Sequence, residues 1–235
     1  MSECDILVVA YKSYSHGNAE HVLHRLNPSA VITVQNGLGN CERLSTIFGS
    51  DRIYAALSTY GVERIAYDEL VIRGEGELEL GPWGKGIHSN VLHALFRTAG
   101  LNCKVSGDIR RAIWLKIGVN CCINPVATLA GARNGELPSL PNTDSLWRSI
   151  SMEVSQAAAL EGVNVSAAEI VAAASDVVAK TSDNTCSMLQ DVRAGRLTEI
   201  EQLSCEVAAR LERAGIPAET SRKLCHAVKQ LHMEK

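Results

Sequence analysis

Short apolar segments alternate with helical segments in the first half of the sequence. Residues 5–11 (DILVVAY) and 30–34 (AVITV) are apolar runs of strand length, and residues 16–26 and 41–49, which follow them, have helical character. An alternation of strands and helices is typical of a doubly wound, parallel sheet. The first half of the chain is therefore predicted to be an α/β domain.

Strand-like segments continue to residue 81, and helical periodicity dominates after residue 108. Residues 52–61 have the pattern of a third strand, and residues 70–81 (LVIRGEGELELG) that of a pair of strands around a glycine turn. The sequence predicts a partial α/β domain over residues 1–107 and an all-helical domain over residues 108–235. Its Ala-, Leu- and Val-rich helical stretches are residues 109–130, 144–161, 167–180, 188–194 and 199–214.

Charge and composition exclude several classes of protein. The 235 residues include 23 basic and 26 acidic ones without a basic run, so we expect no binding to nucleic acid or to an anionic membrane. The N-terminal segment lacks the basic and apolar regions of a signal peptide, and no unbroken apolar run is long enough to span a membrane. We expect a soluble, cytoplasmic protein. A homo-oligomer is possible, because the sequence does not fix the oligomeric state.

The cysteines and histidines do not form a recognisable metal motif. None of the eight cysteines belongs to a C-x-x-C pair, and Cys121 and Cys122 are adjacent, which is a poor arrangement for a disulfide. In a long chain without a signal peptide, the cysteines are predicted to be reduced thiols. His21 and His24 lie one helical turn apart without a third ligand nearby, so we expect a solvated helix face and no metal site.

Residues 114–124 (WLKIGVNCCIN) combine an apolar helix with a narrow polar stripe. Lys116 is the only charged residue from position 112 to position 132, and Asn120 and Asn124 follow it on the same helix face at four-residue intervals. Two interpretations are open. The stripe is the wet face of an amphipathic helix, or it faces a polar ligand, with Lys116 as a general acid for a nearby oxyanion.

Two later segments carry the signature of a helix start. SMLQ (residues 187–190) and TEIE (residues 198–201) fit the capping box, with Ser187 as one N-cap and Glu199 in the first turn of the second helix. Capping is a complete structural explanation for both residues. The first of these helix starts would also offer free N–H groups to a carboxylate or a phosphate.

Polar residues also follow the first two strand segments. Lys12 comes after the first segment, and Asn36 lies within QNGLG after the second. In open parallel sheets, ligands bind beyond the carboxyl ends of the strands, so both residues are candidates for ligand contacts. A solvated cation at Lys12 and a simple Asn-Gly turn at Asn36 are the alternative interpretations.

Taken together, several segments resemble one enzyme family. AYKSY, VQNGLG, WLKIGVNCCINP, NGELP, CSMLQDVRAGRLTEIE and a late Ala-Gly-Ile-Pro match, in order and spacing, the pattern of 2-dehydropantoate 2-reductase, also called ketopantoate reductase. The resemblance covers nearly the whole chain. It implies a Rossmann-like domain and a helical domain similar to the C-terminal domain of 6-phosphogluconate dehydrogenase. It also implies reduction of a 2-oxo acid, 2-dehydropantoate, to pantoate with NADPH, on the route to pantothenate and coenzyme A.

The resemblance assigns roles to individual positions. Lys116 matches the family's catalytic proton donor, and Glu199 matches a glutamate near both the cofactor and the reacting centre. Asn36 matches a residue between nicotinamide and substrate. The other implied contacts are Asn120, Asn124, Asn134 and Ser187 with the substrate, and Lys12 and Val62 with the cofactor.

One family feature is missing from this sequence. A G-x-G-x-x-G turn after the first strand holds the cofactor pyrophosphate, but GLGNCE and GEGELE have Glu42 and Glu79 where the last glycine is expected. Aligned by its motifs, the chain opens at about the family's fourth strand, which leaves a sheet edge unpaired. Three interpretations are open: a sequence that starts late within a longer gene, a truncated relative that cannot bind cofactor, or a non-catalytic interaction module.

Overall fold

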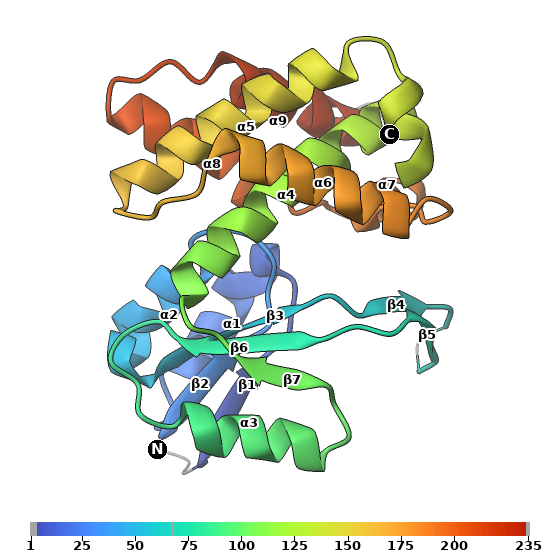
Figure 1. Cartoon of the computed structure of the whole chain (residues 1–235). Helices are drawn as coiled ribbons and strands as arrows, with labels where there is room; N and C mark the ends of the chain where they lie inside the picture. Colours follow the sequence, from blue (N-terminus) through green and yellow to red (C-terminus); the bar gives the residue numbers. More distant parts are fainter. Residues whose placement is uncertain (1–3, 67, 234–235) are drawn as a thin grey trace. The chain divides into compact units, whose positions relative to one another are not determined.

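A five-stranded sheet is the core of the first of two units in this protein. The computed structural model describes residues 4–66 and 68–233, and the chain divides into the units Met1–Ala112 and Ile113–Lys235 (Figure 1). The sheet has the strand order β1-β2-β3-β6-β7. Its strands are β1 (Ile6–Val9), β2 (Ala30–Thr33), β3 (Ile53–Ser58), β6 (Leu78–Pro82) and β7 (Cys103–Val105).

The sheet is mixed rather than wholly parallel. Strands β1, β2 and β3 are parallel, as predicted, whereas β6 runs antiparallel to β3. The chain reverses through a two-stranded ribbon of β4 (Gly61–Arg64) and β5 (Leu70–Gly74), which brings β6 back beside β3. The two strands predicted in residues 70–81 are therefore present, but β5 pairs with β4 and not with β6. The predicted α/β class is confirmed.

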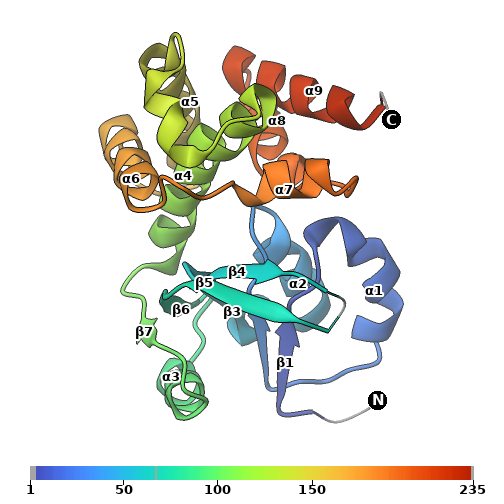
Figure 2. The ribbon, with the colours of Figure 1, turned by 90° about the vertical axis from the view of Figure 1, so that its right-hand side faces the viewer.

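Helices cover both faces of this sheet. Figure 2 shows α1 (His16–Leu23) and α2 (Asn40–Phe48) on one side of the sheet and α3 (Ser89–Thr98) on the other. The first two helices are predicted from the sequence, and α3 is not. Two 3₁₀ turns, Ser13–Ser15 and Ser50–Arg52, complete the helical elements of this unit. The core on the α3 side consists of Ala30, Ile32, Tyr54, Ala56, Leu78, Leu80, Leu92 and Cys103.

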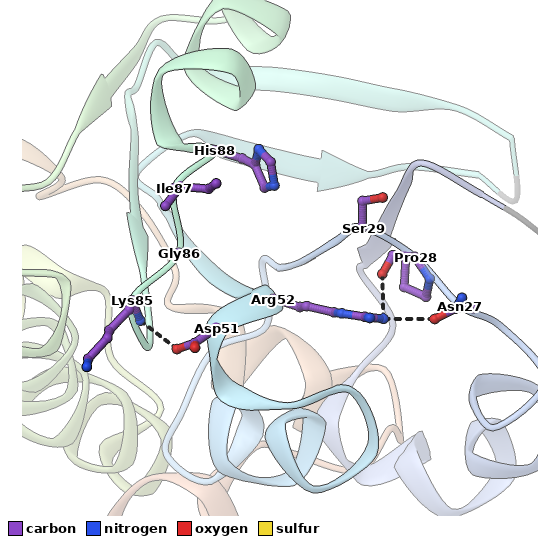
Figure 3. Close-up of a pocket in the computed structure, with 9 residues that line it drawn as sticks. All are labelled: Asn27, Pro28, Ser29, Asp51, Arg52, Lys85, Gly86, Ile87 and His88. Atoms are coloured by element: carbon purple, nitrogen blue, oxygen red, sulfur yellow. Dashed lines mark hydrogen bonds between the residues drawn. The ribbon is translucent and has the colours of Figure 1, made fainter.

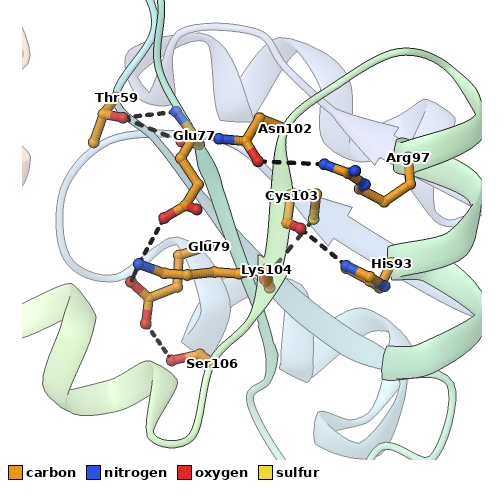
Figure 4. A network of polar contacts seen from close by, with 9 residues as sticks. All are labelled: Thr59, Glu77, Glu79, His93, Arg97, Asn102, Cys103, Lys104 and Ser106. Atoms are coloured by element: carbon orange, nitrogen blue, oxygen red, sulfur yellow. Dashed lines mark hydrogen bonds and ion pairs between the residues drawn. The ribbon is translucent and has the colours of Figure 1, made fainter.

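The short edge strand β7 is held to β6 by exposed polar contacts (Figure 4). The Lys104 ammonium lies 2.7 Å from Glu77 Oε2 and 3.4 Å from Glu79 Oε2. Ser106 Oγ donates to Glu79 Oε1 at 2.5 Å. Such exposed ion pairs each contribute only about 0–1 kcal/mol to stability. A charged edge strand also resists pairing with other chains.

The second unit is built from helices. It contains α4 (Ile109–Ala130, which begins in the first unit), α5 (Thr143–Leu160), α6 (Ala167–Lys180), α7 (Ser187–Arg193), α8 (Ser204–Arg213) and α9 (Glu219–Met233), with 3₁₀ turns at Asn134–Ser139 and Ile200–Gln202. The predicted helix over residues 199–214 is wrong at its start. Leu203 has φ −111° and ψ −110°, which is not helical, so a 3₁₀ turn precedes α8. Helix α9 is missing from the sequence prediction.

A buried carboxylate on α5 caps the start of α9. Glu153 is 9% exposed. Its two carboxylate oxygens accept the backbone N–H groups of Thr220, at 2.9 Å, and Ser221, at 2.7 Å. These N–H groups have no partner within the helix, and an anion favours the positive end of the helix dipole. Glu153 therefore joins α5 to α9 through two charge-assisted hydrogen bonds.

Helices α8 and α9 are also joined by a disulfide. Cys205 and Cys225 are bonded, with their Cα atoms 5.0 Å apart. The expectation that all cysteines are reduced thiols is therefore wrong for this pair. The two helices pack side by side, which brings together two residues whose separation in the sequence fits no motif. The free cysteines of the described residues are Cys4, Cys41, Cys103, Cys121, Cys122 and Cys186.

Helix α4 is long and apolar enough to cross a membrane by length and composition alone. Its sequence contains no unbroken apolar run of that length, because Lys116, Asn120 and Asn124 interrupt it. In the structure, 67% of the most apolar 18-residue stretch of this helix is buried inside the protein. The core helix of a soluble protein passes the same composition test, and the burial of α4 matches that description.

Candidate active site

The polar stripe on α4 is the one strip of this helix segment that reaches the surface. From residue 116 to residue 128, all of which the structure describes, every residue is buried except Lys116, Asn120 and Asn124, which are half-buried. The other sides of α4 pack against its neighbours. A Cβ atom on Gly118 would approach the Ile170 side chain of α6 to 2.6 Å, which shows how closely these two helices meet. Three polar groups thus share one partly open face.

Burial makes the Lys116 ammonium a stronger acid than an ordinary lysine. Loss of hydration lowers the pKa of Lys116 from 10.5 to about 8, and the negative charge of Glu199 acts in the opposite direction. Glu199 is itself buried, at 7% exposure. A cation next to a buried carboxylate, with a pKa close to neutral, suits a group that gives up a proton during a reaction.

A hydrogen-bonded turn after α7 leads the chain to Glu199. The buried Asp191 carboxylate accepts a hydrogen bond from Arg196 Nε at 2.9 Å, and the Arg196 backbone N–H donates to the Asp191 carbonyl at 2.8 Å. Gly195, between them, has φ 67°, a conformation that favours glycine. Glu199 then precedes a 3₁₀ turn as its N-cap residue without a side-chain capping bond. The predicted capping box at residues 198–201 is therefore wrong.

Helix α7 begins one residue earlier than the sequence predicts. Its N-cap is Cys186, whose Sγ accepts the Leu189 N–H at 3.5 Å, and Ser187 is the first helical residue. The Gln190 side chain donates to the Thr185 carbonyl at 2.8 Å instead of returning to Ser187. The Ser187 side chain is thus not the cap and lies at the surface.

Asn134 lies in the interior of the second unit, at 6% exposure. Its Nδ2 donates to Thr181 Oγ1 at 2.8 Å, and its backbone N–H donates to the Asn184 carbonyl at 3.0 Å. Its Oδ1 is buried without a hydrogen-bond partner among the described residues. The Asn134 amide therefore holds the segment that leads from α6 into α7.

In the first unit, two predicted residues lie on neighbouring loops. Lys12 follows β1 and Asn36 follows β2, at the carboxyl ends of two parallel strands, and both are half-buried. Ser13 Oγ donates to the Asn36 carbonyl at 3.2 Å, which ties the two loops together. A second tie runs from Gln35 Nε2 to the Tyr11 carbonyl at 2.8 Å. This is the edge of the sheet at which α/β proteins bind ligands.

A buried histidine lies beneath the first of these loops. His16 is 2% exposed, and its Nδ1 lies 3.0 Å from the Tyr11 hydroxyl. Burial, followed in strength by the positive charge of Arg43, lowers the pKa of His16, so its ring is neutral at pH 7. Its Nε2 has no hydrogen-bond partner among the described residues.

Val62 lies apart from these loops, on the β4–β5 ribbon. It pairs with Ile72, and the two side chains are 51% and 67% exposed. The sequence correctly places Val62 after the third strand.

A pocket of about 450 Å³ in the first unit contains none of the predicted site residues (Figure 3). It lies where β2 and β3 begin, so it is at the opposite edge of the sheet from Lys12 and Asn36. Arg52 Nη1 donates to Asn27 Oδ1 at 2.8 Å and to the Pro28 carbonyl at 3.2 Å. The lining residues are Asn27, Pro28, Ser29, Asp51, Arg52, Lys85, Gly86, Ile87 and His88.

Sequence reasoning missed Cys186, which contacts α4, and the Asp191–Arg196 pair, which closes the turn after α7. Serine, threonine, aspartate and asparagine are the usual N-cap residues, so the thiol before SMLQ gave no signal. An aspartate and an arginine five residues apart around a glycine turn were a readable signal for the Asp191–Arg196 pair.

Comparisons with known proteins agree along the length of the chain. A family described as "Ketopantoate reductase PanE/ApbA" matches residues 1–85, and "Ketopantoate reductase PanE/ApbA C terminal" matches residues 108–232. A 2-dehydropantoate 2-reductase of Halobacterium salinarum is 32% identical over 232 residues, which are 97% of this chain and 76% of the relative. One from Archaeoglobus fulgidus is 28% identical over 229 residues, with the same shares covered.

Solved structures share the fold. The crystal structure of 2-dehydropantoate 2-reductase from Geobacter metallireducens has a TM-score of 0.86 and 26% identity, and covers 97% of this chain and 78% of that one. A complex of D-mandelate dehydrogenase with NADH has a TM-score of 0.93, covers 99% of this chain and 80% of that one, and is 20% identical. At that identity the second likeness concerns the fold alone.

Proposed function

The chain belongs to the ketopantoate reductase family, and on this premise we propose that it reduces 2-dehydropantoate to pantoate with NADPH. The reaction is a step toward pantothenate and coenzyme A. The observation that carries the proposal is the α4 face, where an ammonium with a pKa of about 8 lies beside the buried Glu199 and in line with two carboxamides.

Reduction of a ketone requires a hydride at carbon and a proton at oxygen. The nicotinamide cofactor, when bound, supplies the hydride to C2 of the 2-oxo acid. Lys116 supplies the proton to the C2 oxygen and becomes a neutral amine, which regains a proton from solvent. With a pKa of about 8, about nine-tenths of Lys116 is protonated at pH 7, so the acid is available while its proton remains easy to give up.

The neighbours of Lys116 orient the substrate in this proposal. Asn120 and Asn124 present carboxamides at one-turn intervals along the half-buried face, where each can hydrogen-bond to the carbonyl or hydroxyl oxygens of the substrate. The exposed Ser187 hydroxyl at the start of α7 binds the substrate carboxylate. Asn134 is assigned to the same substrate-binding set by its family position, and its buried hydrogen bonds support an indirect role through the segment that precedes Ser187.

The cofactor contacts are proposed at Lys12, Asn36, Val62 and Glu199. A half-buried cation and a carboxamide at the carboxyl ends of adjacent parallel strands fit the polar nicotinamide half of a dinucleotide. The phosphate half fits less well. Helix α2 starts after Gly39, which has φ 86°, but Glu42 occupies its first turn and brings a negative charge to the place where a phosphate would lie.

Purified protein mixed with 2-dehydropantoate and NADPH tests this proposal. We expect loss of the NADPH absorbance together with formation of pantoate, identified by mass spectrometry, and a much slower rate in the Lys116→Met variant. A parallel reaction with NADH measures cofactor preference. A folded protein that consumes neither cofactor would refute the proposal and favour an inactive relative, and light scattering with a pull-down would then test an interaction module.

A further inference from the structure

The Cys186 side chain connects the start of α7 to the polar face of α4. It is 7% exposed, and its Sγ lies within hydrogen-bond distance of three groups. The Leu189 N–H donates to it at 3.5 Å, the Asn124 carbonyl lies at 3.7 Å, and Thr128 Oγ1 lies at 3.8 Å. One small side chain therefore contacts α7 on one side and two positions of α4 on the other.

The three contacts are consistent with one arrangement of protons. Burial raises the pKa of Cys186, so the thiol is neutral at pH 7 and keeps its single proton. That proton is donated to the Asn124 carbonyl, while Sγ accepts from the Leu189 N–H and from the Thr128 hydroxyl. Each donor and acceptor at this buried junction then has a partner.

The residues on both sides of this junction are those proposed to hold the substrate. The Cys186 thiol forms a hydrogen bond with the backbone carbonyl of Asn124, whose carboxamide lies on the open face of α4. Ser187 is the next residue in the chain. We propose that Cys186 is a positioning residue that fixes the Ser187 hydroxyl relative to the Asn124 carboxamide, so that a 2-oxo acid is held at both ends. The inference rests on the proposed function, since it concerns binding of the same substrate.

Steady-state kinetics of Cys186→Ala and Cys186→Ser test this role. We expect the alanine variant to raise KM for 2-dehydropantoate about tenfold, the cost of losing about one hydrogen bond in positioning, with kcat changed less than about threefold. The serine hydroxyl can donate and accept in the same directions, so we expect it to restore KM to within about threefold of the wild type. An unchanged KM in the alanine variant, or failure of serine to restore it, would overturn the inference.

Cys122→Ala is the matched control. Cys122 is a buried thiol on α4, but the hydrogen-bond partners of its Sγ are on α5: Ser151 Oγ at 3.5 Å and the Trp147 carbonyl at 4.0 Å. Both alanine variants leave a similar cavity, so both are expected to lower Tm, while only Cys186→Ala raises KM. An equal rise in KM in the control would overturn the inference, because general loss of packing would then explain it.

Two further measurements keep the inference testable. Thr128→Val removes the hydroxyl that donates to Cys186 without removing much volume, and its effect on KM should be less than additive with that of Cys186→Ala.

Hydrogen exchange of the Leu189 amide should accelerate in Cys186→Ala and not in Cys122→Ala. If the wild type lacks reductase activity but this amide responds as expected, the proposed function fails while the connection stands. An unchanged exchange rate would overturn the connection itself.

Discussion

Replacing Glu199 with glutamine should move the high-pH decline of the reaction rate to lower pH. The wild-type reaction needs protonated Lys116, whose pKa is about 8 because burial lowers it. About nine-tenths of this lysine is protonated at pH 7 and about one-tenth at pH 9, so kcat/KM should fall about tenfold over that interval. The Glu199 charge raises the pKa of Lys116, so its removal lowers that pKa further.

The assay is initial-rate reduction of 2-dehydropantoate at saturating NADPH across a pH series. The Glu199→Gln variant should begin to lose activity at a lower pH than the wild type does. Lys116→Arg serves as the matched control, because a guanidinium stays protonated and its residual rate should not follow this decline. A decline at the same or a higher pH in Glu199→Gln, or a wild-type rate that stays level to pH 10, would refute the assignment of Lys116 as the acid.

Three stability predictions concern the framework around the site. Glu153→Ala should lower the free energy of unfolding by about 2–3 kcal/mol in urea titrations, because two charge-assisted bonds at the start of α9 are lost; a change below about 0.5 kcal/mol would contradict this. Breaking the bond between Cys205 and Cys225 by mutating both to serine should cost about 3 kcal/mol for a loop of this length, and an unaltered Tm would show that the bond contributes nothing. Gly118→Ala should lower the free energy of unfolding by about 1–3 kcal/mol, because the added methyl group forces Ile170 to move. An unchanged free energy of unfolding would show that Ile170 can move aside without cost.

The sequence predicted those elements whose apolar pattern is continuous. Helices α4 and α6 have the predicted bounds, because apolar residues recur with helical period along the whole of each segment. Helix α9 was missed because only a few of its residues, such as the buried Leu224 and Val228, are apolar, and most of the others are charged or polar. The reversal between β3 and β6 was also missed, since strand direction depends on the intervening ribbon and not on the composition of the strands.

Long-range contacts at the site were less accessible to sequence reasoning. The spacing of Lys116, Asn120 and Asn124 on one face is a local property of a helix, and their shared partial burial agrees with it. The influence of Glu199 on Lys116 depends on the fold of the segment after α7, and only the family resemblance suggested that both serve one reaction. The disulfide and the Cys186 contacts likewise join residues from distant segments and follow no motif.

Direct titration of Lys116 tests the central claim of this account most simply. In protein labelled with ¹³C at its lysine side chains, NMR spectra recorded across a pH series report the pKa of each ammonium, and the Lys116→Met variant identifies the relevant signal. The account predicts that this one resonance titrates near pH 8. Titration near the ordinary lysine value of 10.5 would contradict it, because a fully hydrated ammonium would not be the poised acid on which the proposed reaction depends.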